Sequence, residues 1–283
     1  MPTVNSYFSG IGGMDLGLAQ AGLDIIQSTE LDAKRCEVLR DNFDHDVVCA
    51  DVSQQTVFNR RIADVLVATW PCKRYSTMAD ISGTRTGDDL FVHFLRHVAL
   101  IQPEAYAVEN VPGMAMFPVV MEALSELPGY YVTVFCPVDC RWWLPQRRDR
   151  LILIATRRPF EPRPPSGSPM TVGDILEDDP DVHIPDYVQT RLDGEYRDKP
   201  IVVERDGIAP TCLAHYAKDR STRLVDDGKR VRPFSTREWA RLQGFPDDYK
   251  INLSDRQIYS AVGDAVPVPM GRWVGVELMR YFQ

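Results

Sequence analysis

A cysteine follows a short apolar run in the first third of the chain. Residues 65–68 predict a buried strand, and Trp70-Pro71-Cys72 comes soon after it. Because Pro71 interrupts regular backbone, we expect the Cys72 thiol at the carboxyl end of this strand, where open α/β sheets bind ligands. A free cysteine is more often a small buried side chain, so a presented nucleophile has to be argued from the residues around it.

A glycine-rich turn follows the first expected strand and opens the first expected helix. It reads Phe8-Ser-Gly-Ile-Gly-Gly-Met. Its Gly10, Gly12 and Gly13 can bring backbone N–H groups close to a ligand such as a nucleotide. A plain structural turn can have the same composition, so this turn decides nothing alone.

Two carboxylates follow the next two expected strands. Glu30 ends the second strand and Asp51 follows the third. A carboxylate in the position of Glu30 can accept hydrogen bonds from both hydroxyls of a ribose. Either carboxylate could instead be a solvated loop residue or a cap. Together with the glycine turn, they predict a site that binds a nucleoside across the carboxyl edge of a sheet.

The elements that would position these residues alternate between strand and helix over the first 155 residues. Strands are expected at 4–8, 25–29, 47–50, 65–68, 105–108, 131–135 and 151–155, and helices at 15–21, 33–42, 90–101 and 119–127. This alternation predicts an α/β fold with a parallel sheet and crossover helices.

The alternation stops at a proline-rich segment, residues 158–169. Short mixed segments follow to about residue 250, which indicates a small irregular second domain. Residues 273–281 return to helical spacing, and we expect Val274, Val276 and Leu278 to pack back on the first domain.

Composition limits the class of protein. The chain has 283 residues, 44% of them hydrophobic, and a formal net charge of -8. It can bury a substantial core but is not expected to coat nucleic acid nonspecifically. No apolar run approaches the roughly 20 residues of a membrane span, and no charged leader precedes one, so we expect a cytoplasmic protein.

The six cysteines form no C-x-x-C pairs, which predicts free thiols and neither a zinc site nor a disulfide framework. Basic residues gather in segments 141–163 and 218–241, which could line one cleft or be solvated faces.

Further chemical residues complete an ordered set. The fifth expected strand leads into Glu109-Asn-Val111, and the last is preceded by Gln146-Arg-Arg-Asp-Arg150. Arg237-Glu-Trp-Ala-Arg-Leu-Gln-Gly-Phe-Pro246 and Gly263-Asp-Ala-Val-Pro267 come later. With Phe-x-Gly-x-Gly-Gly and Pro-Cys ahead of them, these motifs resemble those of the cytosine-5 DNA methyltransferase family, in family order and over nearly the whole chain.

The resemblance implies an α/β fold with a Rossmann-like class I methyltransferase sheet domain at residues 1–163. A small irregular target-recognition domain would span 164–252, and residues 253–283 would return to the first domain. We expect this cytoplasmic enzyme to be encoded by a bacterium or a phage. A monomer is the simplest expectation, and the sequence leaves the oligomeric state open. The enzyme would transfer a methyl group from S-adenosylmethionine to C5 of a cytosine flipped out of double-stranded DNA, and would release S-adenosylhomocysteine. No metal is required, because neither addition nor methyl transfer needs a Lewis acid.

Roles for single residues follow from the same resemblance. Cys72 would attack C6 of the base and Glu109 would donate a proton to N3, while Arg150 would hold the cytosine O2 and Arg148 would anchor the mobile loop or backbone. The donor would contact Phe8, Gly10, Gly12, Gly13, Glu30, Asp51, Pro71, Asp264 and Val266. DNA contacts are implied for Lys73, Arg74, Ser76, Lys218, Arg220, Arg223 and Arg232, with residues 73–90 as the loop that closes over the base.

Two positions depart from the family pattern. Lys73 stands where the family usually has Gln, and Asp264 where it usually has Asn. Lys73 could activate the Cys72 thiol, contact a phosphate or fill the space left by the flipped base. Asp264 could pair with Lys73 or Arg74. The alternatives are a modified S-adenosylmethionine donor, a tRNA substrate, and a DNA-binding regulator that has lost turnover.

Overall fold

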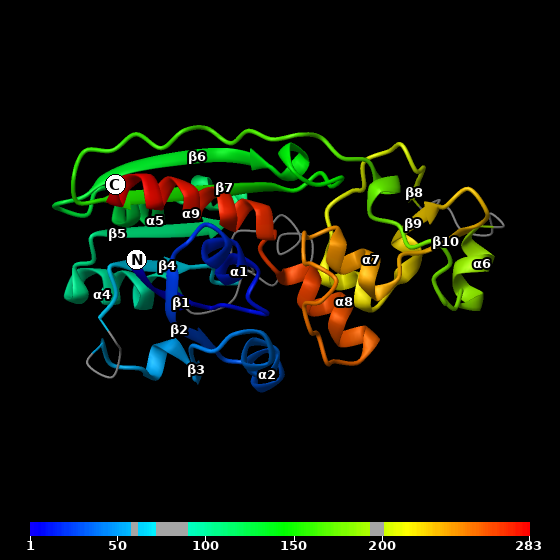
Figure 1. The fold of residues 1–283 in the computed structure, drawn as a ribbon, viewed down its shortest axis with the longest axis horizontal. Coiled ribbons are helices and arrows are strands. Elements are labelled where there is room, and N and C mark those ends of the chain that lie inside the picture. Colours follow the sequence, from blue (N-terminus) through cyan, green and yellow to red (C-terminus); the bar gives the residue numbers. More distant parts are fainter. Residues whose placement is uncertain (58–61, 72–89, 193–200) are drawn as a thin grey trace. The chain divides into compact units, whose positions relative to one another are not determined.

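The computed structural model describes residues 1–57, 62–71, 90–192 and 201–283. These residues form two compact units (Figure 1). The first comprises Met1–Val138, Asp149–Pro165 and Val268–Gln283, and the second comprises Asp139–Arg148 and Ser166–Pro267. The chain therefore leaves the first unit twice and returns to it twice.

A seven-stranded sheet forms the centre of the first unit, with strand order β3-β2-β1-β4-β5-β7-β6. Its strands are β1 (Thr3–Tyr7), β2 (Asp24–Glu30), β3 (Asp46–Cys49), β4 (Val65–Ala68), β5 (Ala105–Asn110), β6 (Tyr131–Asp139) and β7 (Asp149–Thr156). The pairs among β1 to β5 are parallel, as the alternation predicts. The expectation of a fully parallel sheet was wrong at β7, which pairs with β5 in the antiparallel sense.

The central strands are apolar without alternation because both faces of the sheet are covered. Every residue of β4 and of β5 is buried, the pattern typical of parallel strands between helical layers. On one face, Tyr7, Leu66 and Tyr106 join a core cluster with Phe94 and Leu124. The two last residues belong to the helices on that face. The helices of this unit are α1 (Gly13–Gln20), α2 (Ala33–Asn42), α4 (Leu90–Ile101), α5 (Pro118–Ser125) and α9 (Val268–Phe282).

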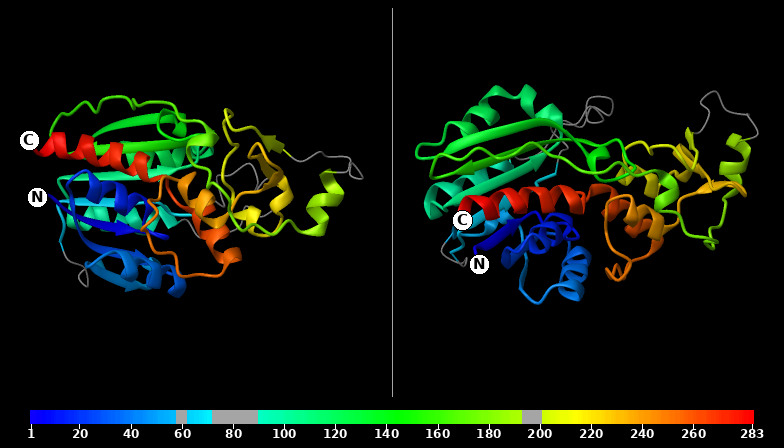
Figure 2. Two further views of the ribbon diagram at one scale, coloured as in Figure 1. Left: turned by 45° about the vertical axis from the view of Figure 1, so that its right-hand side comes forward. Right: turned by 45° about the horizontal axis from the view of Figure 1, so that its top comes forward.

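Helix α9 packs against α1, and the two run close together in both views of Figure 2. Their approach requires a glycine, since a Cβ at Gly17 would lie 2.4 Å from Arg272 N and Val268 O. Val274 and Leu278 are fully buried as expected, but the expectation for Val276 was wrong, because it is exposed. Residues 274 and 278 share one face of a helix of 3.6 residues per turn, and residue 276 lies on the other. No described helix is long and apolar enough to cross a bilayer.

The second unit is small and contains short elements. A three-stranded sheet has the order β10-β9-β8, and aromatic rings fill the core beside it: Tyr216 stacks on Trp239 with ring centroids 4.1 Å apart, and Tyr259 meets Tyr216 edge-on. Its elements are α6 (Asp186–Leu192), β8 (Ile201–Val203), β9 (Arg223–Asp226), β10 (Val231–Pro233), α7 (Thr236–Arg241) and α8 (Asp255–Asp264). The irregular character expected from the sequence is therefore observed.

Candidate active site

The glycine turn after β1 is tied to the end of β2 by the Glu30 carboxylate. Glu30 Oε2 accepts a hydrogen bond from Gly10 N at 2.8 Å, and Oε1 accepts from Leu31 N and Asp32 N at 2.9 Å. Gly10 has φ +58°, and a Cβ added there would meet no atom within 4 Å. Gly12, at φ +83°, caps α1. The turn therefore leaves open space in front of a carboxylate and a helix N-terminus.

A fully buried carboxylate, Asp15, supports this turn from behind. Ser6 and Ser28 both donate to it, and Ser9 of the turn donates to Ser6. Burial raises the pKa of Asp15, while the hydrogen bonds from Ser28 and Ser6 act in the opposite sense. Asp15 was not predicted as a functional residue, although it is the first residue of the helix expected at 15–21 and follows the glycine turn directly.

The ends of β1 and β4 are joined at the position where the predicted Pro-Cys turn begins. Thr69 Oγ1 donates to Phe8 O at 2.9 Å, and the Phe8 ring meets Trp70 edge-on. Asn110 Nδ2 donates to Trp70 O at 3.1 Å. The residue before Pro71 is thereby held to the end of β5, a positioning role for Asn110 that the sequence reasoning did not assign. Asp51 lies beyond β3 and caps a short turn by accepting from Ser53 N at 2.9 Å.

Glu109 and Arg150 meet at the ends of neighbouring strands. Glu109 is the fifth residue of β5, opposite Ile152 of β7, so Arg150 lies just beyond it on the antiparallel strand. Arg150 Nε donates to Glu109 Oε1 at 2.8 Å, with both side chains about nine-tenths buried. A carboxylate and a guanidinium in this arrangement can both face one edge of a planar ring that carries donors and acceptors.

Comparison with known proteins decides the class. The sequence model of C-5 cytosine-specific DNA methylases matches residues 3–198 and 188–280. The chain belongs to this family. It is a methyltransferase for C5 of cytosine in DNA, and its reaction requires a methyl donor.

Individual relatives agree over nearly the full length of this methylase. It is 30% identical to the Type II methyltransferase M.NlaX of Neisseria lactamica, over 96% of this chain and 94% of that protein. Type II methyltransferase M.NgoBI of Neisseria gonorrhoeae is 31% identical, over 93% of this chain and 88% of the relative. The structure of the Entamoeba histolytica methyltransferase EhMeth has a TM-score of 0.83 at 17% identity, covering 100% of this chain and 99% of its own, and shows the same fold.

The structure describes some of the expected site residues of the methylase and not others. Cys72, Lys73, Arg74 and Ser76 lie outside the described residues. Pro71 is described and exposed. Phe8, Gly10, Gly12, Gly13, Glu30, Asp51, Glu109 and Arg150 lie in the first unit, at the ends of β1, β2, β3, β5 and β7. Asp264 and Val266 belong to the second unit, where Asp264 is exposed and Val266 is buried.

Arg148, which was expected to anchor the mobile loop or backbone, contacts backbone in the second unit. Its guanidinium is buried and donates to three carbonyl oxygens, those of Cys212, Gly263 and Ala265. Two of these carbonyls flank Asp264. Arg148 therefore anchors backbone, and it fixes the segment that carries Asp264.

Gln146, two residues before Arg148, also binds the backbone at Cys212. It is fully buried, accepts from Cys212 N at 2.8 Å and donates to Leu242 O at 2.7 Å. Gln146 begins the Gln146-Arg-Arg-Asp-Arg150 motif, but no role was predicted for it from the sequence. Residues 146 and 148 are buried, whereas residues 147 and 149 are exposed. The first and third residues of the motif therefore point into the protein, where they bind backbone groups.

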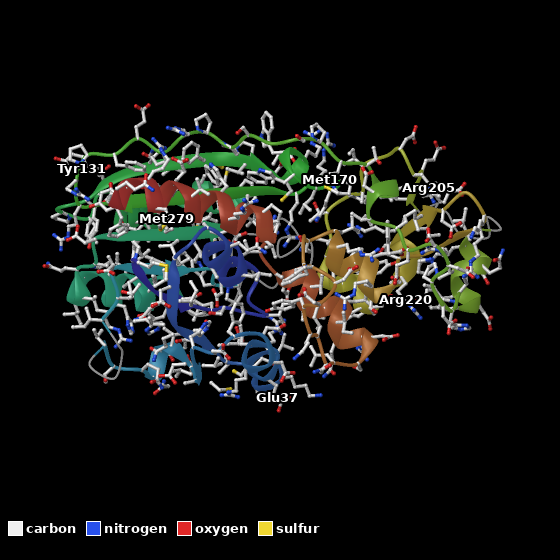
Figure 3. All side chains as sticks on the ribbon, viewed as in Figure 1. Glu37, Tyr131, Met170, Arg205, Arg220 and Met279 are labelled. Atoms are coloured by element: carbon white, nitrogen blue, oxygen red, sulfur yellow. The ribbon has the colours of Figure 1, made fainter. Side chains whose placement is uncertain are left out.

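Among the basic residues expected to contact DNA, three remain at least partly accessible in the second unit. Lys218 is exposed. Arg220, labelled in Figure 3, lies over the ring of Tyr259, with Cζ 6.0 Å from the centroid. Arg223 is half-buried, and burial lowers its pKa.

The expectation for Arg232 was wrong. Its side chain is 0% exposed and pairs with Glu238 at 2.8 Å and with Asp227 at 2.6 Å. Sequence position alone placed it in a basic segment, but β10 turns it inward, where Glu238 of α7 neutralises it. Arg232 therefore stabilises the second unit and does not contact DNA.

Loss of Glu238 should destabilise the protein strongly. Glu238→Ala would leave the buried Arg232 charge without its fully buried partner, which typically costs about 3–5 kcal/mol. Urea unfolding followed by circular dichroism measures the change. The matched control is Asp247→Ala in the turn that follows α7, because the Arg241–Asp247 pair is partly exposed and such pairs contribute only about 0–1 kcal/mol. Equal losses in the two variants would contradict a structural role for the buried pair.

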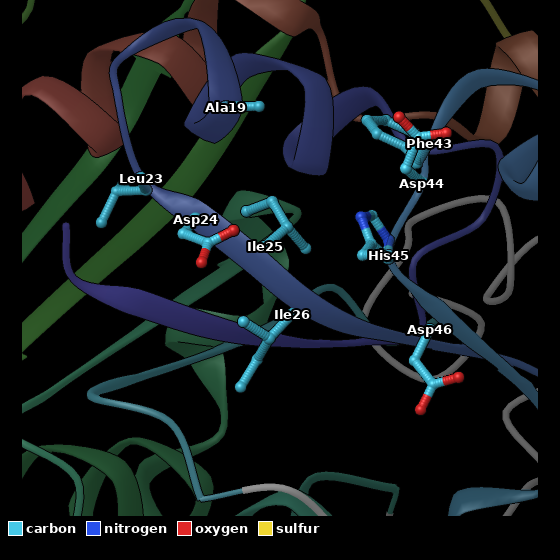
Figure 4. A pocket seen from close by; sticks show the side chains of 9 residues that line it. All are labelled: Ala19, Leu23, Asp24, Ile25, Ile26, Phe43, Asp44, His45 and Asp46. Carbon is cyan, nitrogen blue, oxygen red and sulfur yellow. The ribbon is translucent and has the colours of Figure 1, made fainter.

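A pocket of about 590 Å³ lies beside β2, away from these groups (Figure 4). It is lined by Ala19, Leu23, Asp24, Ile25, Ile26, Phe43, Asp44, His45 and Asp46. No predicted site residue lines it. His45 Nε2 lies 2.6 Å from Ser28 Oγ, which donates to Asp15, so a chain of hydrogen bonds links the pocket to the carboxylate behind the glycine turn.

Proposed function

We propose that this methylase transfers a methyl group from S-adenosylmethionine to C5 of a cytosine flipped out of double-stranded DNA, through a covalent bond between Cys72 and C6. The observation that carries the proposal is the Glu109–Arg150 pair at the sheet edge that also carries the glycine turn and Glu30. The edge combines groups for a base with groups for a nucleoside-like donor, as open α/β sheets do.

The chemistry explains the two halves of this edge. Cytosine C5 is a poor nucleophile, and addition of a thiolate at C6 converts the ring into an enamine that is nucleophilic at C5. The addition develops negative charge that a proton on N3 relieves. N3 and O2 are neighbours on one edge of the base, so Glu109 and Arg150, which lie 2.8 Å apart, can address both. After transfer, loss of the C5 proton and expulsion of the Cys72 sulfur restore the aromatic ring.

The donor assignment is supported by the open space at Gly10 and by the carboxylate of Glu30. S-adenosylmethionine supplies an electrophilic methyl group. Glu30 would accept from its ribose hydroxyls, and the N–H groups at the start of α1 would face its charged tail. Asp51, Phe8 and Pro71 would border the adenine. Asp264 and Val266 stay predictions for the same donor.

The second unit is proposed to recognise the target sequence. Lys218 and Arg220 would contact phosphates, and other side chains of residues 164–252 would read bases in the major groove. The relatives named above are Type II methyltransferases, which supports a role in restriction-modification. A monomer suffices, because the proposed chemical groups all come from one chain. The target base must be unstacked at a cost of a few kcal/mol.

The test is product analysis by mass spectrometry. The full chain is incubated with methyl-deuterated S-adenosylmethionine and unmethylated duplex DNA made by polymerase chain reaction, and in parallel with bulk tRNA. We expect labelled 5-methylcytosine from DNA and none when the donor is omitted. Label in tRNA alone would move the substrate to RNA. Absence of label from both, with donor binding confirmed by calorimetry, would contradict the proposed activity.

A further inference from the structure

Two thiols contact the backbone at Glu30, the residue whose carboxylate holds the glycine turn, and at its neighbour Leu31. Cys36, on the first half of α2, donates from Sγ to Glu30 O at 3.4 Å, and Cys49, the last residue of β3, donates to Leu31 O at 3.9 Å. The two thiols therefore contact the carbonyl groups of consecutive residues, and Cys49 is near enough to help raise the pKa of the Cys36 thiol. In the parallel pair β2–β3, Glu30 lies directly opposite Cys49. The pair is thus set by one helix and two strand ends.

The two sulfurs differ in access to solvent. Cys36 is fully buried, whereas Cys49 is exposed. Burial, assisted by the neighbouring Cys49, raises the pKa of the Cys36 thiol to about 12, so Cys36 stays protonated. An oxidant in solution therefore reaches Cys49 first, and Cys36 is placed to react with the oxidised sulfur. This asymmetry is typical of a redox-reactive cysteine with a resolving partner.

We propose that Cys36 and Cys49 form a reversible disulfide that weakens binding of the methyl donor. The effect on the donor rests on the donor site assigned under Proposed function, whereas formation of the disulfide does not. A peroxide is the oxidant. The Cys49 thiolate attacks one peroxide oxygen and hydroxide leaves, giving a sulfenic acid. The Cys36 sulfur then attacks Cys49 Sγ, and the proton of the Cys36 thiol passes to the hydroxyl group that leaves Cys49 as water. Two thiols and one hydrogen peroxide yield one disulfide and two waters, and dithiothreitol reverses the change.

The structure connects this bond to the donor site through Glu30. A disulfide bond is about 2.05 Å long, so the sulfurs must approach far closer than a hydrogen-bonded contact allows. The approach removes the S–H donors from Glu30 O and Leu31 O and pulls on the segment between them. The side chain of Glu30 holds Gly10, and Asp51 follows Cys49 by two residues. Two of the carboxylates assigned to the donor are therefore displaced by one bond.

Among the other described cysteines, two are buried and one is exposed, and the exposed one provides a control. Cys140 and Cys212 are buried, and the burial of Cys212 raises its pKa to about 12. Cys136 is exposed on β6. Cys136→Ser therefore removes another exposed thiol, one that the proposal does not use. Because Cys72 is expected to react with oxidants on its own, all measurements use the full chain carrying Cys72→Ala.

The experiment treats this protein with hydrogen peroxide and maps its cysteines by alkylation after unfolding, tryptic digestion and mass spectrometry. Calorimetry then measures the affinity for S-adenosylhomocysteine in the reduced, oxidised and re-reduced protein. We expect peptide 36–40 joined to peptide 41–60, and an affinity that falls about 5-fold or more on oxidation and recovers with dithiothreitol. Cys49→Ser should abolish both effects, and Cys136→Ser should abolish neither.

Two results would overturn the proposal. One is alkylation of both Cys36 and Cys49 after peroxide treatment, which would show that no disulfide forms. The other is a mapped disulfide with unchanged affinity for S-adenosylhomocysteine. If the reduced protein binds no S-adenosylhomocysteine, the donor assignment itself fails, and the peptide map still decides whether the thiol pair forms the bond.

Discussion

Cys72→Ala is expected to abolish methyl transfer, with a loss in kcat on the order of 10⁶-fold, the scale typical for removal of a covalent nucleophile. No other group can replace the thiolate, because the ring becomes nucleophilic at C5 only after addition at C6. Single-turnover transfer of labelled methyl groups to duplex DNA measures the change. Cys72→Ser should be almost as impaired, since a hydroxyl is hardly ionised near neutral pH.

Trapping separates loss of chemistry from loss of binding. DNA that contains 5-fluorocytosine should form a stable adduct with the unaltered protein, because fluorine at C5 blocks the final elimination. Cys72→Ala should form no adduct while it still binds DNA and S-adenosylhomocysteine. The matched control is Cys49→Ser, which removes an exposed thiol and, under reducing conditions, should leave both transfer and trapping intact. An adduct with Cys72→Ala would assign the nucleophile to another residue.

Much of the first unit could be predicted because its signals are local. Runs such as 65–68 and 105–108 are short, apolar and bounded by turns, so their strand character is encoded within the run itself. Gly10 and Gly12 adopt positive φ, a property of the residue type. The order of strands then places the glycine turn, Glu30 and Glu109 at one edge, because consecutive parallel strands end on the same side.

Burial of charge could not be predicted, since it depends on partners far along the chain. Arg148 and Arg150 stand two residues apart in one motif. One is held by carbonyls of residues 212, 263 and 265, and the other pairs with Glu109. Arg232 belongs to a basic segment, yet β10 directs it to Glu238. The proximity of Cys36 and Cys49 could not be predicted for the same reason. Thirteen positions separate them, and they come together only because α2 places Cys36 against Glu30 O and the β2–β3 register places Cys49 opposite Glu30.

The Glu109–Arg150 pair gives the proposed mechanism two states with different partners. Without a base, the guanidinium Nε–H is donated to Glu109 Oε1, which suits an ionised carboxylate. To donate a proton to N3, the Glu109 carboxyl group must be protonated, and a neutral carboxyl group interacts less strongly with the Arg150 guanidinium. Cytosine O2 can accept from Arg150 in place of the carboxylate. Entry of the base would therefore exchange one ion pair for two contacts on the same edge of the ring.

Glu109→Gln should lower kcat by about 10²–10⁴-fold, the usual contribution of a positioned general acid. The amide keeps the shape of the side chain and can donate a hydrogen bond to N3, but it cannot transfer a proton as the thiolate adds. Single-turnover methylation and the rate of 5-fluorocytosine trapping should fall together, while DNA affinity changes little. Glu104→Gln is the matched control, because Glu104 precedes β5 at its opposite end and pairs there with Tyr281. A Glu109→Gln variant as active as Glu104→Gln would show that protonation of N3 does not come from this carboxyl group.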